Sequence, residues 1–110
     1  MNRYMVIIEA SDSAFKGLLD NPHDRKEAVE PLFQAIGATV EHYWIGVGSN
    51  TLYIVFVAPD NTVDLEAISI LVMSSGVAKS MEMRQLMTSG EAVAALRRAA
   101  DLSYSPPTSD

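Results

Sequence analysis

The segment Leu52–Val57 is apolar at all six of its positions, and this feature most constrains the fold of the chain. Successive residues of a β-strand point to opposite faces of a sheet, so a strand of this kind is apolar on both faces. Turn-forming residues flank the segment, Gly48-Ser49-Asn50 before it and Pro59-Asp60-Asn61 after it, which favours a short strand over a helix. The fold must therefore cover both faces of part of a sheet.

The apolar periodicity and the capping residues predict the other elements of the chain. Strands are expected at residues 4–10, 39–47, 51–58 and 77–87. Helices are expected at residues 12–20, 22–36, 62–73 and 91–102, and residues 103–110 should form an extended polar tail. Asn21 is the expected N-cap of the second helix, in which Pro31 should cause a kink or a break. The third helix should bury a stripe of apolar residues, namely Leu65, Ile68, Leu71 and Val72.

The predicted order is βαββαβ followed by a helix. It is the ferredoxin-like order of an α+β fold, in which four antiparallel strands carry two helices on one face. A chain of 110 residues has room for one such core. We expect residues 1–88 to form this domain and residues 89–110 to form the C-terminal helix and tail.

The helices cover one face of the sheet, so the opposite face needs a separate explanation. The alternate residues of the central strands are apolar in both sets, and one set supplies the interface candidates Met5, Ile7, Val55 and Val57. Such a face measures roughly 400 Å² from ~4.8 Å between strands and ~3.3 Å per residue, which is comparable to the largest apolar patch of a typical monomer. A second copy about a two-fold axis is the favoured cover. The alternative is that the Ala-rich helix at 91–102 folds back over the face.

Composition excludes several classes of partner and site. The net charge of −6, with eight Lys and Arg residues, argues against nucleic-acid binding. The chain has no Cys, and its two His residues have no metal-ligand spacing, so no metal or other cofactor is predicted. No apolar run is long enough for a signal peptide or a membrane span, so a cytoplasmic location without membrane contact is expected.

Polar and aromatic residues interrupt the apolar strands and form the set of ligand-binding candidates. These are Glu9, His42, Trp44, Tyr53, Glu82 and Arg84. His42 and Trp44 share one face of their strand and are suited to a planar small molecule, which they would hold by stacking and one hydrogen bond. In the alternative, the strand is an edge strand with a solvated histidine, and we prefer this because a lone histidine is weak evidence of a site.

Charged residues within the strands give a second hypothesis. Glu82 and Arg84 lie two residues apart on one face and are expected to form a cross-strand network with Glu9. A carboxylate covered by an interface has a raised pKa, which makes it a stronger proton acceptor that can act as a general base. The alternative, that these are charges at a solvated rim, is preferred because burial has to be observed before catalysis is inferred.

Short motifs throughout the chain resemble one known family. The motifs are Arg3-Tyr4-Met5-Val6, Asn21-Pro22, Ala35-Ile36-Gly37-Ala38, Glu41-His42-Tyr43-Trp44, Ala58-Pro59-Asp60-Asn61, Ser75-Gly76, Leu86-Met87-Thr88 and Ser103-Tyr104-Ser105-Pro106-Pro107. Their order is similar to that of the GYD-domain family, which is named for a Gly-Tyr-Asp turn after its second strand. Here the turn reads Gly48-Ser49-Asn50, so the glycine is kept and the aromatic and acidic residues are replaced. The resemblance implies a ferredoxin-like domain similar to dimeric α+β-barrel proteins, without a settled activity.

Three classes of function follow from these observations. The first is a homodimer or higher homo-oligomer that binds a small apolar or aromatic ligand between its subunits. The second is a small cofactor-independent enzyme of the monooxygenase or isomerase type, in which Glu9, His42 or Tyr53 acts as acid, base or hydrogen-bond donor. The third is a structural domain whose role is self-association alone.

Overall fold

The fold is known from a computed structural model that describes residues 1–107. Its elements, in chain order, are β1 (Asn2–Ala10), α1 (Asp12–Asp20), α2 (Arg25–Gln34), β2 (Thr39–Ile45), β3 (Thr51–Ala58), α3 (Thr62–Ser74), β4 (Ala78–Leu86) and α4 (Ser89–Ala100). Each predicted strand and helix is therefore present, and most of their boundaries differ from the predicted ones by a few residues. The predicted tail reaches residue 110, and its last three residues lie outside the described part.

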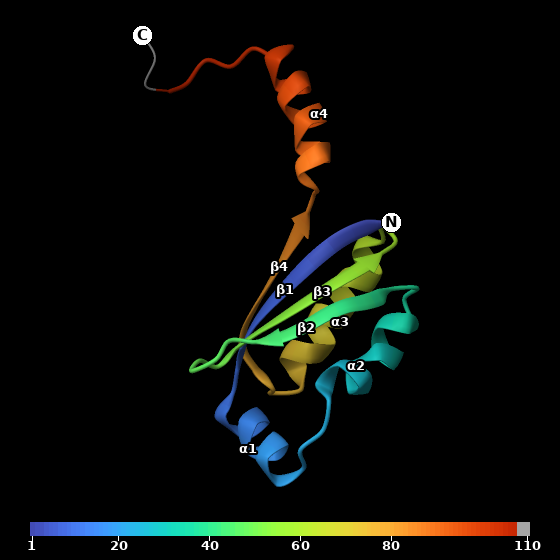
Figure 1. The fold of residues 1–110 in the computed structure, drawn as a ribbon, viewed down its shortest axis with the longest axis vertical. Coiled ribbons are helices and arrows are strands. Elements are labelled where there is room, and N and C mark those ends of the chain that lie inside the picture. Colours follow the sequence, from blue (N-terminus) through green and yellow to red (C-terminus); the bar gives the residue numbers. More distant parts are fainter. Residues whose placement is uncertain (108–110) are drawn as a thin grey trace.

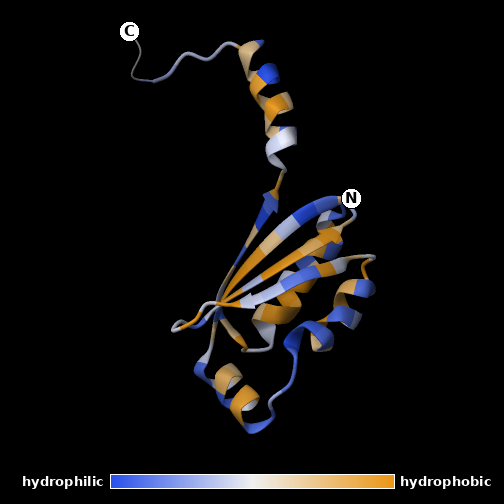
Figure 2. Ribbon diagram, viewed as in Figure 1, coloured by the Kyte–Doolittle hydropathy of each residue, from blue (hydrophilic) through white to orange (hydrophobic). Residues whose placement is uncertain are grey.

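The four strands form one antiparallel sheet in the order β2-β3-β1-β4, as expected for a ferredoxin-like α+β fold. Strand β3 is central because its residues are apolar on both faces, whereas β2 and β4 are edge strands with more polar residues. Figure 1 shows the strands side by side, with α2 and α3 on one side of the sheet and α1 beyond its end. In Figure 2 hydrophobic residues follow β3 along most of its length.

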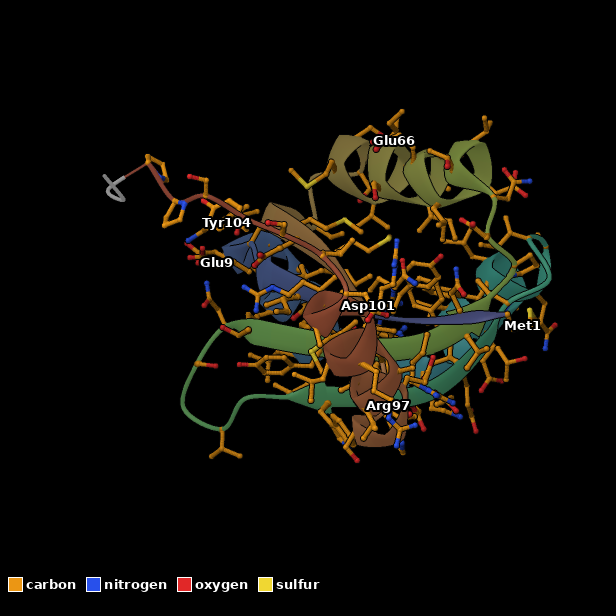
Figure 3. All side chains as sticks on the ribbon, turned by 90° about the horizontal axis from the view of Figure 1, so that it is seen from above. Met1, Glu9, Glu66, Arg97, Asp101 and Tyr104 are labelled. Carbon is orange, nitrogen blue, oxygen red and sulfur yellow. The ribbon has the colours of Figure 1, made fainter. Side chains whose placement is uncertain are left out.

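The core lies between the sheet and the helices. Tyr4, Val6 and Ile8 of β1 point to this side, and the antiparallel register places Phe56, Ile54 and Leu52 of β3 opposite them. Phe56 is fully buried, and its ring lies 5.3 Å from that of Tyr4 and 4.8 Å from that of Phe33 on α2. Figure 3, viewed from above, shows α3 over one face of the sheet with Glu66 on its outer side.

The helix boundaries correct three sequence predictions. Asp24, not Asn21, caps α2, and its carboxylate accepts a hydrogen bond from the Lys26 amide at 2.9 Å. Asn21 instead ends α1. Helix α2 continues through Pro31, so the predicted break is absent, and the kink stays a prediction. Leu71 was predicted to be buried on α3 but is 54% exposed, whereas Ile68 on the same helix is buried.

The β2–β3 hairpin closes through residues 46–50. Gly48 has a φ of +77°, which a residue without a β-carbon adopts at little cost, as its sequence position predicted. Asn50 does not share this conformation, since only glycines have positive φ in the described residues. The Asn50 side-chain amide instead donates to the Glu9 carboxylate at 3.2 Å and to the Ala10 carbonyl at 3.3 Å, which ties the hairpin to β1.

Helix α4 projects away from the sheet beyond the end of β4, and the molecule is 59 Å along its longest axis (Figure 1). A capping box starts the helix: Thr88 accepts from the Glu91 amide, and Glu91 accepts from the Thr88 amide, each at 3.0 Å. These bonds hold the pKa of Glu91 below its ordinary value. Because α4 projects away from the sheet, the alternative in which this helix folds back over the sheet is wrong. The apolar side chains of Val93 and Leu96 on this helix are exposed.

Candidate functional site

The sheet face opposite the helices, called here the open face, contains every candidate residue from the sequence. The ligand-binding candidates on it are Glu9, His42, Trp44, Tyr53, Glu82 and Arg84, and the interface candidates are Met5, Ile7, Val55 and Val57. The register arranges them in rows across the strands. One row runs Glu82, Ile7, Tyr53, Trp44, and the next runs Arg84, Met5, Val55, His42. The open face is therefore apolar at its centre and polar at both edges.

Paired charges flank this apolar centre. Arg3 and Glu41 form a two-pronged ion pair, with Nε–Oε1 and Nη2–Oε2 distances of 2.7 and 3.0 Å. An irregularity in the β2–β3 register between Val40 and His42 makes Glu41 an extra residue, so its side chain reaches over β3 to β1. The hydrogen bond from Arg3 lowers the pKa of Glu41, and the same contact raises that of Arg3.

The acidic candidates do not form the predicted network. Glu82 pairs with Arg84 on the same strand at 2.9 Å, and its side chain is 55% exposed. Glu9 lies in another row, where its carboxylate accepts from Asn50 at 3.2 Å and lies 3.4 Å from the Ser80 hydroxyl. Each carboxylate thus has its own partners at the edge of the face, which agrees with the rim alternative and gives no general base in this single chain.

His42 and Trp44 stack on each other on edge strand β2, with ring centroids 4.5 Å apart and planes 13° apart. Trp44 is 52% exposed, so the pair forms a shelf on the open face and is not enclosed. The geometry suits a flat partner laid against it, which a ligand or a second protein surface can supply.

A cavity of about 390 Å³ lies on the other side of the sheet, between the sheet and helices α1, α2 and α3. This volume is within the range of about 300–1,000 Å³ that is typical of small-molecule sites. Its wall is mainly apolar, with Val6, Ile8 and Ile54 from the sheet and Phe15, Leu32 and Ile68 from the helices. Residues of α1 and α2, which residues 21–24 connect, line the cavity on its helix side.

Polar side chains also line the same cavity: Ser13 from α1, and a group formed by His23, Arg25 and Tyr43. Arg25 and His23 are joined by a 3.0 Å contact between Nη1 and Nε2. Burial raises the pKa of Tyr43, and the charge and hydrogen bonding of nearby Arg25 partly oppose this rise. Sequence reasoning named none of these three residues as a candidate and missed this group. The alternation of β2, which sets Tyr43 on the face opposite His42 and Trp44, was the available signal.

The raised pKa of Tyr43 predicts a pH effect on stability. Above about pH 10, where an ordinary tyrosine ionises, the unfolded chain releases this proton and the folded chain keeps it. The free energy of unfolding should therefore fall as pH rises past this value, and less steeply in Tyr43→Phe. Urea unfolding at neutral and alkaline pH measures the difference, with Tyr104→Phe, an exposed site, as the control. An equal fall in the free energy of unfolding at alkaline pH in the wild type and in Tyr43→Phe would contradict the burial of Tyr43.

Residues 1–107 lack two further kinds of feature. Within this range no helix is long and apolar enough to cross a membrane. The same residues contain no cluster of three or more His, Asp or Glu side chains suited to holding a metal ion.

Comparison with known proteins agrees with the family suggested by the sequence motifs. No curated protein matches the chain significantly. The family model described as GYD domain matches residues 4–96, which include all four strands and most of α4. This match covers most of the 110 residues. The chain therefore belongs to the GYD-domain family.

Proposed function

We propose that this protein is a self-associating module that binds a small apolar molecule in the cavity beneath its sheet. The cavity carries the proposal, because it combines ligand-sized volume, an apolar wall and a few polar groups at one corner. The proposal moves the ligand from the subunit interface, where the sequence predicted it, to the helix side. The open face is then left for assembly.

Self-association is supported by two surfaces on which apolar side chains stay at least partly accessible in a single chain, while Val55 at the centre of the open face is already buried. One is the open face, where four of the charges are neutralised as the ion pairs Arg3–Glu41 and Arg84–Glu82 and so are less costly to cover. The other is α4, a 12-residue helix with Val93 and Leu96 exposed. Isolated helices of about 12 residues are marginal in water, so α4 needs a packing partner.

The surface areas also favour an interface that includes both the open face and α4. A standard interface covers about 800 Å² on each partner, which exceeds the roughly 400 Å² of the open face calculated from strand spacing. Helix α4 supplies further area. We therefore propose a two-fold homodimer in which the open face and α4 both contact the second copy.

Gly17 offers a test of the cavity. It lies on α1, lines the cavity, and has open space where a β-carbon would stand. Gly17→Leu should fill part of the cavity and weaken binding of the neutral fluorescent probe N-phenyl-1-naphthylamine by tenfold or more, if ~1.4 kcal/mol of apolar contact is lost. Gly17→Ala is the matched control, which should keep binding and stabilise the fold by about 0.5–1 kcal/mol through its better helix propensity.

The fluorescence titration and thermal unfolding of both variants give the readout. Probe binding that is equally strong in Gly17→Leu and Gly17→Ala would place the probe elsewhere and contradict the proposal. Failure of the wild-type protein to bind the probe would contradict it as well.

A further inference from the structure

The polar corner of the cavity contains a guanidinium whose charge is not neutralised. The four ion pairs found in residues 1–107 join Arg3 to Glu41, Lys26 to Glu30, Lys79 to Asp12 and Arg84 to Glu82, and Arg25 belongs to none of them. The nearest acidic residue in sequence, Asp24, uses an oxygen to cap α2. Arg25 is half-buried and lines the cavity wall. A half-buried cation without an anionic partner is a recognition element for an anion.

His23 is oriented so that it does not compete for that anion. Its Nδ1 lies 2.8 Å from the Asn21 carbonyl oxygen. A carbonyl only accepts, so Nδ1 carries the proton and donates. In the neutral ring Nε2 is then an acceptor, and it accepts from Arg25 Nη1 at 3.0 Å. The imidazole therefore holds the guanidinium in place and leaves its charge intact.

Tyr43 adds a second donor beside Arg25. Its pKa is raised by burial, so the hydroxyl keeps its proton at neutral pH and can donate it to a ligand. Arg25 lies near the N-terminus of α2, and Tyr43 points to the helix side from β2, so the two donors come from elements on different sides of the cavity. An acceptor atom held between a guanidinium and a phenol gains two hydrogen bonds, one of them charge-assisted.

We propose that the cavity binds small apolar monocarboxylic acids, with the carboxylate at Arg25 and Tyr43 and the hydrocarbon part against the apolar wall. This inference rests on the proposed function, because it names the chemical class of the molecule in the same cavity. A carboxylate matches the planar guanidinium of arginine, which can donate two parallel hydrogen bonds to it. Its single negative charge neutralises the single positive charge of Arg25. A phosphate dianion brings excess negative charge into a mainly apolar site, and a cationic ligand meets like charge at Arg25.

The test compares octanoate with 1-octanol, which have the same chain length and differ in the charged head. Calorimetric titration of the wild-type protein should give tighter binding of octanoate by about tenfold or more, the factor for ~1.4 kcal/mol. Arg25→Gln should remove this preference by weakening octanoate binding tenfold or more, and it should weaken 1-octanol binding by a smaller factor. Lys26→Gln is the control, because Lys26 is the adjacent cation, pairs with Glu30 and is absent from the cavity wall. Tyr43→Phe should reduce octanoate affinity to a smaller extent.

The outcomes separate this inference from the proposed function. Equal binding of octanoate and 1-octanol by the wild-type protein overturns the carboxylate assignment and leaves apolar binding in the cavity standing. An octanoate preference that survives in Arg25→Gln, with folding confirmed by circular dichroism, overturns the role of Arg25. Absence of binding for both probes overturns the proposed function, and this inference with it.

Discussion

Phe56→Ala is expected to lower the free energy of unfolding by about 3–5 kcal/mol, the usual cost of truncating a buried phenylalanine. Phe56 is completely buried, and its ring packs between those of Tyr4 on β1 and Phe33 on α2. Its removal leaves a void where the sheet meets the helices, and two aromatic partners cannot both move to fill it. Chemical unfolding measures the loss.

Leu71→Ala provides the comparison for this result. Leu71 is 54% exposed on α3, so its truncation should change stability by only about 0.5 kcal/mol, as for surface sites generally. Similar losses in the two variants would contradict the difference in burial between Phe56 and Leu71. A large loss in Leu71→Ala would mean that Leu71 is buried, as the sequence predicted.

Trp44→Glu is expected to dissociate the proposed oligomer while leaving each chain folded. Trp44 is half-exposed in the single chain, so the substitution costs little there. In a two-fold interface the same change places two carboxylates under a covered surface, and it removes a side chain of the type that dominates binding energy. We expect the dissociation constant to rise by roughly 100-fold or more, equivalent to ~2.7 kcal/mol.

Sedimentation velocity measures this change, and Leu71→Glu is the matched control. It introduces the same charge at a position of similar exposure on the helix side, away from the open face. An oligomer that persists in Trp44→Glu, or that dissociates equally in both variants, would rule out the open face as the interface.

The strands and their faces were predictable because local pattern decides them. In β1 the alternation of residues places Tyr4 and Val6 on one face of the sheet and Met5 and Ile7 on the other. The sequence did not determine which of the two sets faces the helices. The register and the helix positions answer this: Tyr4 and Val6 are buried in the core, and Met5 and Ile7 lie on the open face. Gly48 was likewise predictable, since its positive φ is a local requirement of the hairpin.

The cavity and the course of α4 were not predictable, because they depend on how elements pack. His23 and Arg25 are near neighbours in sequence and look like ordinary residues near a helix start, and only the fold brings them to Tyr43. Asn21 and Asp24 are both good caps, and the choice between them depends on where the end of α1 leaves the chain. Helix α4 has few large apolar residues, which gave no indication that it would extend beyond the sheet.

Trp44 provides the most direct test of the claim that a second copy covers the open face. It is the single tryptophan of the chain, so its fluorescence reports this face alone. The account predicts that acrylamide quenches Trp44 weakly at high protein concentration, and that dilution to the monomer increases quenching and shifts the emission to the red. Strong quenching at every concentration, as expected for an indole that is 52% exposed, would contradict the account.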